Sequence, residues 1–352
     1  MKEEQMKAIV KERDGFDGWK IKEQERREPK DDEIEIQVKA AGICGSELHL
    51  WHDNHYYTPG TVIGHEYSGQ ISRVGRNVSK WKAGDRVVTE NRYTACGICE
   101  FCRNGNRAMC KSAVPVGYKS DGGWRKYTYV PATELIKIPD NVSFEEAAMT
   151  EPAAVITEAL CVKEPVRAGE TVLIQGCGTM GLLACMVAKN MGASKVIITG
   201  TDADVKLRLP LAEKIGADET VNVQREDLLA AVDRITEGNG VDYIAECSGA
   251  PGAVKSSLDA AKKLGRIVAI GESPAESIDF DWNKAVFKAL TLKFHFGSDY
   301  NAWHIAVRMM ENGSLNVKPL ITHRISMADF RKGFGYLDDK EALKVIMYPF
   351  ED

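Results

Sequence analysis

The 352-residue sequence has no excess of positive charge, since 46 lysines and arginines stand against 51 aspartates and glutamates. A protein that binds nucleic acid needs a basic face to neutralise phosphates, so we expect no nucleic-acid partner. The first residues, MKEEQMKAIV, lack the cationic region and apolar stretch of a secretory signal, and a cytoplasmic location is therefore expected. Biased tracts and short-period repeats are also absent, which favours an ordinary globular chain.

Long hydrophobic runs are equally scarce. One apolar segment, residues 172–188, contains Gln175 and three glycines, and it is too short to cross a bilayer comfortably. We therefore expect no membrane partner. The length exceeds what one ordinary core accommodates, so two domains are predicted.

Four of the nine cysteines are isolated in apolar or motif surroundings, and we interpret them as small buried hydrophobic residues. They are Cys161, Cys177, Cys185 and Cys247.

Another four cysteines form a C-x2-C-x2-C-x7-C array: Cys96, Cys99, Cys102 and Cys110. Four thiolates on one loop can close a tetrahedral shell around zinc, which leaves no position for substrate and so predicts a structural site. Such a metal would fold a lobe that has little apolar core of its own. An iron–sulfur cluster and disulfides are the alternatives, and a cytoplasmic chain disfavours disulfides.

The first part of the chain is predicted to be rich in strands. Residues 34–40 alternate like a half-buried strand, and residues 84–88 form a turn that leads into another. Short runs of this kind continue from Met6 to about Glu151 and favour a distorted barrel. Near its end, Ser143 followed three residues later by a glutamate predicts a capped helix start.

Beyond this point strands and helices alternate. Short apolar strands between amphipathic helices predict a doubly wound parallel sheet. The predicted strands are 171–176, 195–200, 241–249 and 265–271, with one helix at 179–191 and another ending at 211–217. The alternation stops after about residue 287, and segments 290–296, 303–310 and 344–350 are expected to rejoin the first domain. The prediction is an α/β chain with one domain at 1–152 and 289–352 and the other at 153–288.

A dinucleotide fingerprint lies between the first predicted strand and helix of the second domain. Gly176 permits a tight turn, Gly178 lets pyrophosphate approach the backbone, and Gly181 allows close packing of helix on strand. Thr179 and Met180 begin the helix, whose free N–H groups and dipole attract phosphate. The alternative is a glycine-rich turn without nucleotide.

The residues that select the cofactor are expected about twenty positions further on. The second strand ends at Gly200, followed by Thr201 and Asp202, so no carboxylate stands directly at the strand end to repel a 2′-phosphate. Lys206 and Arg208 are candidate phosphate partners, although Asp202 could still reach the ribose. The prediction is NAD(P)(H), with a slight preference for NADP(H).

A second metal site is predicted from dispersed residues. Cys44, His65, Glu66 and Glu151 together offer sulfur, nitrogen and oxygen donors, and a catalytic zinc keeps three protein ligands and one open position. Each residue alone is more often structural, so this chemistry is only suggestive.

The combined pattern resembles the zinc-containing medium-chain dehydrogenases, especially their polyol (sorbitol dehydrogenase-like) branch. The resemblance extends along the chain from Met6 and rests on the order of several segments. They are CGSELH, GHEYSG, VGRNVSKWKAGDRVV, the four-cysteine array, TEPAAV, the glycine turn, ECSGAP and VKPLITHR. It implies a GroES-like catalytic domain formed from both chain ends, with a Rossmann domain inserted.

The resemblance also implies roles for the dispersed residues. Zinc would be held by Cys44 and His65, with Glu66 as a third donor or as an orienting neighbour. Glu151 stands where the alcohol-dehydrogenase branch usually has cysteine, and it could ligate zinc or hold a water there. While the alcohol carbon transfers hydride to the nicotinamide, the hydroxyl proton would leave through Ser46, a ribose hydroxyl and His49.

The sequence departs from the polyol branch at the substrate positions. Leu50 replaces a tyrosine, and Gly297 with Ser298 replaces an arginine and a tyrosine that would contact a polyol. A diol, another sugar alcohol or a 3-hydroxy amino acid such as threonine is therefore expected in place of sorbitol itself.

A catalytically silent nucleotide-binding relative and a zinc-free quinone reductase are the competing hypotheses. The resemblance suggests a homodimer or homotetramer.

Overall fold

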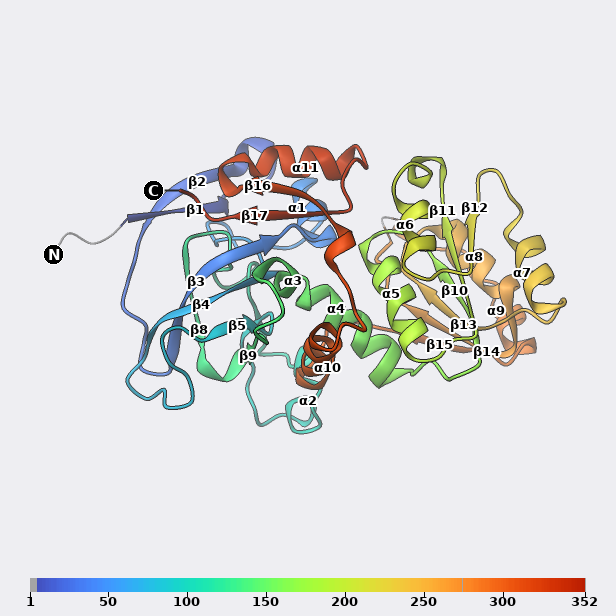
Figure 1. The fold of residues 1–352 in the computed structure, drawn as a ribbon, viewed down its shortest axis with the longest axis horizontal. Coiled ribbons are helices and arrows are strands. Elements are labelled where there is room, and N and C mark those ends of the chain that lie inside the picture. The colour runs from blue at the N-terminus through green and yellow to red at the C-terminus, as the bar shows by residue number, and fades with distance from the viewer. Residues whose placement is uncertain (1–4, 274, 352) are drawn as a thin grey trace. The chain divides into compact units, whose positions relative to one another are not determined.

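The computed structural model describes residues 5–273 and 275–351, and the chain divides into two compact units. The first unit extends through Ala154 and resumes at Asp299, and the second comprises Val155–Ser298. Both ends of the chain therefore belong to the first unit, as the colours of Figure 1 show.

The first unit is built on a seven-stranded sheet in the order β16-β17-β3-β4-β5-β9, with β8 paired to β3. The chain returns to this sheet at its C-terminal end, since β17 pairs with β3 and runs antiparallel to it. The strands are β3 (Glu33–Gly42), β4 (Tyr67–Val74), β5 (Arg86–Thr89), β8 (Tyr127–Pro131), β9 (Leu135–Lys137), β16 (Ile321–Ser326) and β17 (Lys344–Tyr348). β1 (Gln5–Lys11) and β2 (Trp19–Glu25) form a separate antiparallel pair.

The predicted strand at 34–40 is confirmed as part of β3, but the expectation of a half-buried strand is wrong. Ile34 and Ile36 lie in the apolar core, yet Glu35 between them is also fully buried. Although burial opposes ionisation, hydrogen bonds from Arg73 and Arg26 lower the pKa of Glu35 to about 2. Arginine side chains thus cover a face that the alternating pattern assigned to solvent.

The predicted helix start at Ser143 is confirmed. Ser143 caps α3 (Phe144–Ala148) in a reciprocal capping box with Glu146, which satisfies two backbone N–H groups at the helix start. α4 (Thr150–Thr157) follows directly and carries Glu151.

The second unit contains a six-stranded parallel sheet in the order β12-β11-β10-β13-β14-β15. This is the strand order of a Rossmann fold, with the switch point beside β10. The strands are β10 (Thr171–Gln175), β11 (Lys195–Gly200), β12 (Glu219–Asn222), β13 (Val241–Glu246), β14 (Ala261–Ala269) and β15 (Thr291–Phe294). The helices are α5 (Thr179–Asn190), α6 (Arg208–Lys214), α7 (Leu228–Thr236), α8 (Pro251–Ala260) and α9 (Trp282–Phe287).

The expectation that residues 290–296 rejoin the first domain is wrong. β15 pairs in parallel with β14, so the second unit continues beyond the predicted boundary at 288. Hydrogen bonding to β14 places this segment in the second sheet, although the alternation of strands and helices in the sequence stops near residue 287. The later segments do belong to the first unit, as α10 (Tyr300–Glu311), α11 (Phe330–Asp338) and β17.

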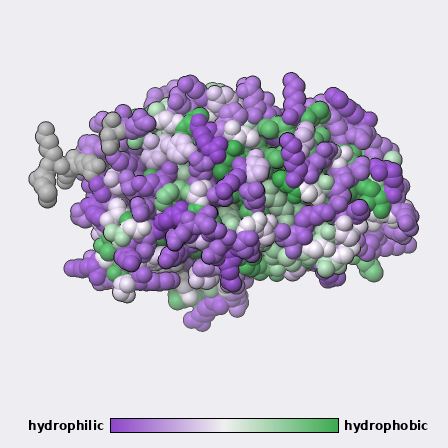
Figure 2. Space-filling view, viewed as in Figure 1, coloured by the Kyte–Doolittle hydropathy of each residue, from purple (hydrophilic) through white to green (hydrophobic). Residues whose placement is uncertain are grey.

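The visible face in Figure 2 is covered mainly by hydrophilic residues, with hydrophobic ones scattered among them. Within the described residues no helix is both long and apolar enough to span a bilayer.

Candidate active site and metal centres

The glycine fingerprint lies at the turn between β10 and α5. Gly176 has a φ of 93°, which favours glycine, and a Cβ on Gly181 would lie 1.8 Å from the carbonyl oxygen of Gly176. A Cβ on Gly178 would meet nothing within 4 Å, so the backbone here is open to a ligand. Thr179 and Met180 begin α5 and are partly exposed, so the positive end of the helix dipole faces this turn.

The loop after β11 holds the residues predicted to select the cofactor. Asp202 accepts hydrogen bonds from Arg225 at 2.5 Å and Asn222 at 2.7 Å, and Lys206 is exposed. Arg208 is largely buried and pairs with Asp204 at 3.1 Å, so this predicted phosphate partner is already engaged. Arg225, which no sequence motif indicated, comes from the loop after β12 and is 61% exposed.

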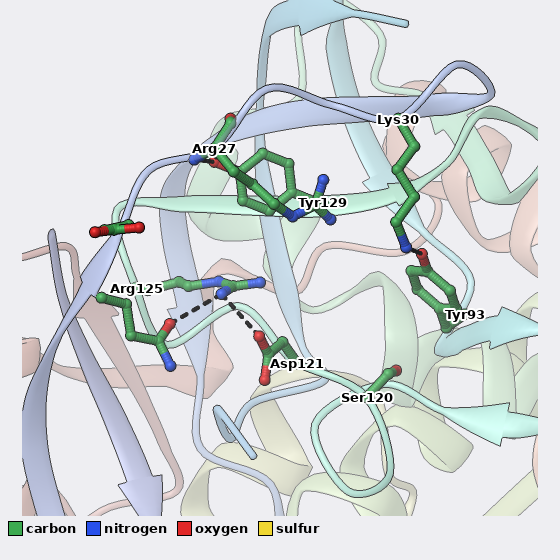
Figure 3. A pocket seen from close by; sticks show the side chains of 9 residues that line it. Arg27, Lys30, Tyr93, Ser120, Asp121, Arg125 and Tyr129 are labelled. Carbon is green, nitrogen blue, oxygen red and sulfur yellow. Dashed lines mark hydrogen bonds and ion pairs between the residues drawn. The ribbon is translucent and has the colours of Figure 1, made fainter. Parts of the chain in front are cut away.

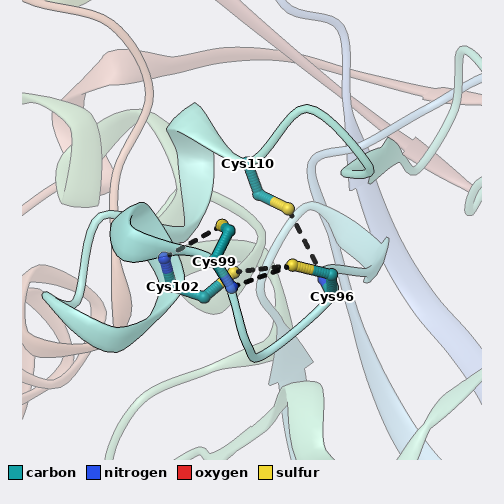
Figure 4. A group of neighbouring side chains, drawn as sticks. All are labelled: Cys96, Cys99, Cys102 and Cys110. Atoms are coloured by element: carbon teal, nitrogen blue, oxygen red, sulfur yellow. Dashed lines mark hydrogen bonds between the residues drawn. The ribbon is translucent and has the colours of Figure 1, made fainter.

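The four-cysteine array forms a small lobe, residues 96–110, which we call the cysteine lobe (Figure 4). The four sulfur atoms all lie within 4.8 Å of one another, close enough to ligate one metal ion. The nine cysteines of the chain are all described and all free, which removes the disulfide alternative. The lobe is inserted between two short paired strands, β6 (Arg92–Thr94) and β7 (Val114–Pro115).

The dispersed residues also meet at one point. We call Cys44, His65, Glu66 and Glu151 the catalytic cluster, and one donor atom from each lies within 4.8 Å of the others. Cys44 precedes α1 (Gly45–Trp51), the His–Glu pair precedes β4, and Glu151 comes from α4. All four belong to the first unit.

Glu47 orients the histidine of this cluster. The Nδ1 atom of His65 lies 2.5 Å from Oε1 of Glu47, whose other oxygen accepts a hydrogen bond from the backbone N–H of Cys44. Burial opposes ionisation of Glu47, but the histidine charge and these hydrogen bonds lower its pKa. A carboxylate on Nδ1 leaves Nε2 free to bind a metal.

Glu66 is held from the far end of the chain. Nζ of Lys344, on β17, donates to both of its carboxylate oxygens, at 2.8 and 2.7 Å. Both side chains are almost completely buried. Glu151 differs, because its Oε1 accepts a hydrogen bond from Asn91 at 2.8 Å while Oε2 lies 3.9 Å from Nε2 of His65.

The two predicted relay residues lie three positions apart on α1, and therefore on one side of the helix. Oγ of Ser46 accepts a hydrogen bond from the hydroxyl of Tyr118 at 2.7 Å, and that hydroxyl also lies 3.3 Å from Nδ1 of His65. His49 is partly buried. Tyr118 was missed because it belongs to a separate loop and to no motif.

The charges of the catalytic cluster fit a divalent cation. Burial raises the pKa of Glu151 to about 7, with a further increase from Glu66, and both factors also raise the pKa of the Cys44 thiol. The acidic groups of Cys44, Glu66 and Glu151 are thus enclosed beside Lys344 and His65, and the buried carboxylate of Glu47 adds a further negative charge. A zinc ion would offset this repulsion and match the sulfur, nitrogen and oxygen donors.

A cavity of about 430 Å³ lies elsewhere on the first unit and contains none of these donors (Figure 3). Both arginines that line it have acidic partners within the protein. Arg125 donates to Asp121 and Gln24, and Arg27 pairs with Glu33. We therefore assign the chemistry to the catalytic cluster.

Known proteins resemble this chain along nearly its whole length. Residues 30–140 match the alcohol dehydrogenase GroES-like domain, and residues 179–312 match the zinc-binding dehydrogenase domain. A sorbitol dehydrogenase of Halalkalibacterium halodurans is 32% identical over 98% of this chain and 100% of its own length. An L-threonine 3-dehydrogenase of Cronobacter sakazakii is 35% identical over 89% of this chain and 91% of its own.

Among solved structures, a putative zinc-binding dehydrogenase from Sinorhizobium meliloti bound to NADP superposes with a TM-score of 0.90. It is 28% identical, and the match covers 98% of this chain and 100% of the other. The fold and the site thus define an oxidoreductase with a GroES-like and a Rossmann domain.

The chain belongs to the zinc-containing alcohol dehydrogenase family, and it is a zinc-dependent enzyme that uses NAD(P). The predicted fold class and reaction class are confirmed, and the silent-relative and quinone-reductase hypotheses lose their support.

Proposed function

We propose that the enzyme oxidises a secondary alcohol to a ketone at the catalytic cluster, with Cys44, His65 and Glu151 as the direct zinc donors. The observation that carries this proposal is the convergence of sulfur, nitrogen and carboxylate donors within 4.8 Å. Glu151 is preferred to Glu66 as third donor, because Lys344 binds both oxygens of Glu66. Glu66 then contributes negative charge beside the metal.

When bound, zinc supplies the Lewis acidity that lowers the pKa of the substrate hydroxyl, and NAD(P)+ supplies the hydride acceptor. Ser46 would accept the hydroxyl proton on Oγ while its own hydrogen leaves toward a ribose hydroxyl of the bound cofactor, and His49 would pass that proton to water. The Tyr118 hydroxyl occupies one lone pair of Ser46 and so restricts how that hydroxyl turns. The buried His65 and Glu66 keep water away from the reacting atoms.

The substrate class that we propose is a polyol, sugar alcohol or diol. The sorbitol dehydrogenase relative supports it, whereas Gly297 and Ser298 lack the donors expected for sorbitol itself. The second candidate is a 3-hydroxy amino acid, which the L-threonine 3-dehydrogenase relative supports.

A panel of polyols, diols and L-threonine, assayed with NAD+ and NADP+ on protein of measured zinc content, tests this proposal. We expect cofactor reduction with at least one secondary alcohol. Zinc-loaded protein that reduces neither cofactor with any member of the panel would contradict it.

We propose a preference for NADP(H). Gly200 ends β11, and a Cβ there would lie 2.7 Å from Sγ of Cys177, so packing excludes a carboxylate at this position. Lys206 is an exposed cation on the loop after β11, whereas Arg225 is exposed but pairs with Asp202 at 2.5 Å, and the relative from S. meliloti is bound to NADP. We expect a higher kcat/KM with NADP+ and a loss of this preference in Lys206→Ala. A higher kcat/KM with NAD+ would overturn the preference.

We also propose a homodimer or homotetramer that uses the edge of the second sheet. β15 is the last strand of that sheet, and the side chains of Phe294, Phe296 and Phe287 are 79%, 65% and 79% exposed. An apolar sheet edge of this kind favours pairing with another chain. Light scattering should give at least twice the chain mass, and Phe294→Lys should lower it. A monomeric wild-type protein would contradict this proposal.

A further inference from the structure

Asn91 occupies a position between the two metal centres of the first unit. It lies between β5 and β6, just before the chain enters the cysteine lobe. Its side-chain amide donates to Oε1 of Glu151 at 2.8 Å. Neither the motifs nor the mechanism above assigns it a role.

The hydrogen bond distinguishes the two oxygens of Glu151. Oε1 receives the amide hydrogen, and Oε2 lies 3.9 Å from Nε2 of His65, the nitrogen that Glu47 leaves free. A carboxylate with one oxygen held in this way presents the other as a single ligand atom. Glu151 is only 6% exposed, so little water is available to replace the amide.

Backbone hydrogen bonds hold the segment around Asn91, which joins the start of the cysteine lobe to the residues that follow its end. Its carbonyl oxygen accepts a hydrogen bond from the N–H of Val116, just beyond β7, while the N–H of Glu90 donates to the carbonyl of Glu134. The lobe is tied to the same region, because Arg107 pairs with Glu134 at 2.6 Å. These backbone hydrogen bonds and the Arg107–Glu134 pair therefore hold the segment that carries the Asn91 amide.

We propose that Asn91 is a positioning residue for the catalytic zinc: its amide holds one oxygen of Glu151 so that the other faces the metal position between Cys44 and His65. This inference rests on the proposed function. Residues that orient a ligand in this way typically change metal affinity about 10- to 100-fold when they are replaced.

The test compares cobalt binding by the wild-type protein, Asn91→Leu and Asn91→Asp. Leucine has nearly the same size but no donor, and aspartate places a second carboxylate against Glu151. We expect the affinity of the catalytic cluster, measured by chelator competition, to fall about 10- to 100-fold in Asn91→Leu and further in Asn91→Asp. The cobalt absorption bands of that site should change while those of the four-thiolate site stay constant, and kcat should fall more than KM rises.

Asn77→Leu is the matched control, because Asn77 makes the same kind of amide–carboxylate bond, to Asp32 at 3.0 Å, on an exposed loop. It should leave both cobalt sites unchanged. Asn91→Gln keeps the donor on a longer side chain, and partial recovery of affinity would separate positioning from a general defect in folding.

Two results would count against different claims. If Asn91→Leu and Asn91→Asp keep the catalytic-site affinity within about twofold and the same cobalt spectrum, the inference is overturned. If the wild-type protein binds metal in the cysteine lobe and none at Cys44, the proposed function itself fails.

Discussion

The two metal centres are built in opposite ways. The cysteine lobe takes four like donors from one stretch, residues 96–110, and its first thiol, on Cys96, is exposed. The catalytic cluster takes three kinds of donor from three separate segments, and His65, Glu66 and Glu151 are each at most 6% exposed.

The difference shows what each centre requires from the fold. In the lobe a bound metal would organise a loop whose four thiols lie close together in the sequence, so the sequence spacing nearly suffices. In the catalytic cluster the fold comes first, because Glu47 and Lys344 orient and balance donors that would repel one another. A metal in the cysteine lobe would stabilise the local fold, whereas in the catalytic cluster the fold positions the metal donors.

The largest expected effect is on catalysis. Cys44→Ser should lower kcat/KM by about 1000-fold or more, because the substrate loses a metal that provides several kcal/mol of transition-state stabilisation. The melting temperature should change little. Cys161→Ser, outside both centres, is the control, and comparable activity in both variants would remove Cys44 from the metal site.

Thiol reactivity should separate the two centres next. In metal-free protein, hydrogen bonds from the backbone N–H groups of Ile98 and Cys99 lower the pKa of Cys96 to about 6, whereas burial raises the pKa of Cys44. Cys96 is therefore mostly thiolate above pH ~6 and should be alkylated roughly 30-fold faster than Cys44 at pH 7, as mass spectrometry can measure. Below pH ~6 its rate should fall as the thiolate is protonated.

Zinc should protect both thiols. Equal alkylation rates at Cys96 and Cys44 in the metal-free protein would show that the environments of the two centres do not differ as described.

Loss of the lobe metal should have a smaller, local effect. Cys110→Ser should make residues 96–110 roughly tenfold more sensitive to protease, because little apolar core remains there. Activity should fall by no more than about tenfold, since only the support of Asn91 is weakened. Global unfolding of the second unit in this variant would contradict a local role, and limited proteolysis followed by mass spectrometry would reveal it.

The smallest effect concerns the relay. Tyr118→Phe removes one hydrogen bond to Ser46, worth about 1 kcal/mol, so kcat should fall about fivefold. Its pH profile should also change, because the Ser46 hydroxyl is less restricted. Tyr56→Phe changes a neighbouring ring, whose centroid is 5.6 Å from that of Tyr118, and should leave the profile as it was. Identical profiles for all three proteins would exclude Tyr118 from the proton path.

Features encoded locally could be predicted from the sequence. The cysteine spacing, the capping box at Ser143 and the turn at Gly176 each depend on residues close together in the chain, and each pattern has few structural solutions. The strands β10, β11, β13 and β14 were predictable for the same reason, since each contains a short apolar run, whereas β12 was not predicted.

Features made by distant contacts could not be predicted. Nothing near Glu66 in the sequence indicates Lys344, and nothing near Glu151 indicates Asn91. β15 was assigned to the wrong domain because its position depends on pairing with the edge of β14, and no local sequence pattern indicates that pairing.

The contact between Lys344 and Glu66 has a consequence for biosynthesis. Residues 155–298 form one continuous stretch, but the first unit lacks β17 until residues 344–348 have been translated. Until then Glu66 has no lysine beside it. The catalytic cluster is therefore completed only after the whole second unit has been synthesised, and a chain that stops before β17 would contain all residues of the second unit but an incomplete metal centre.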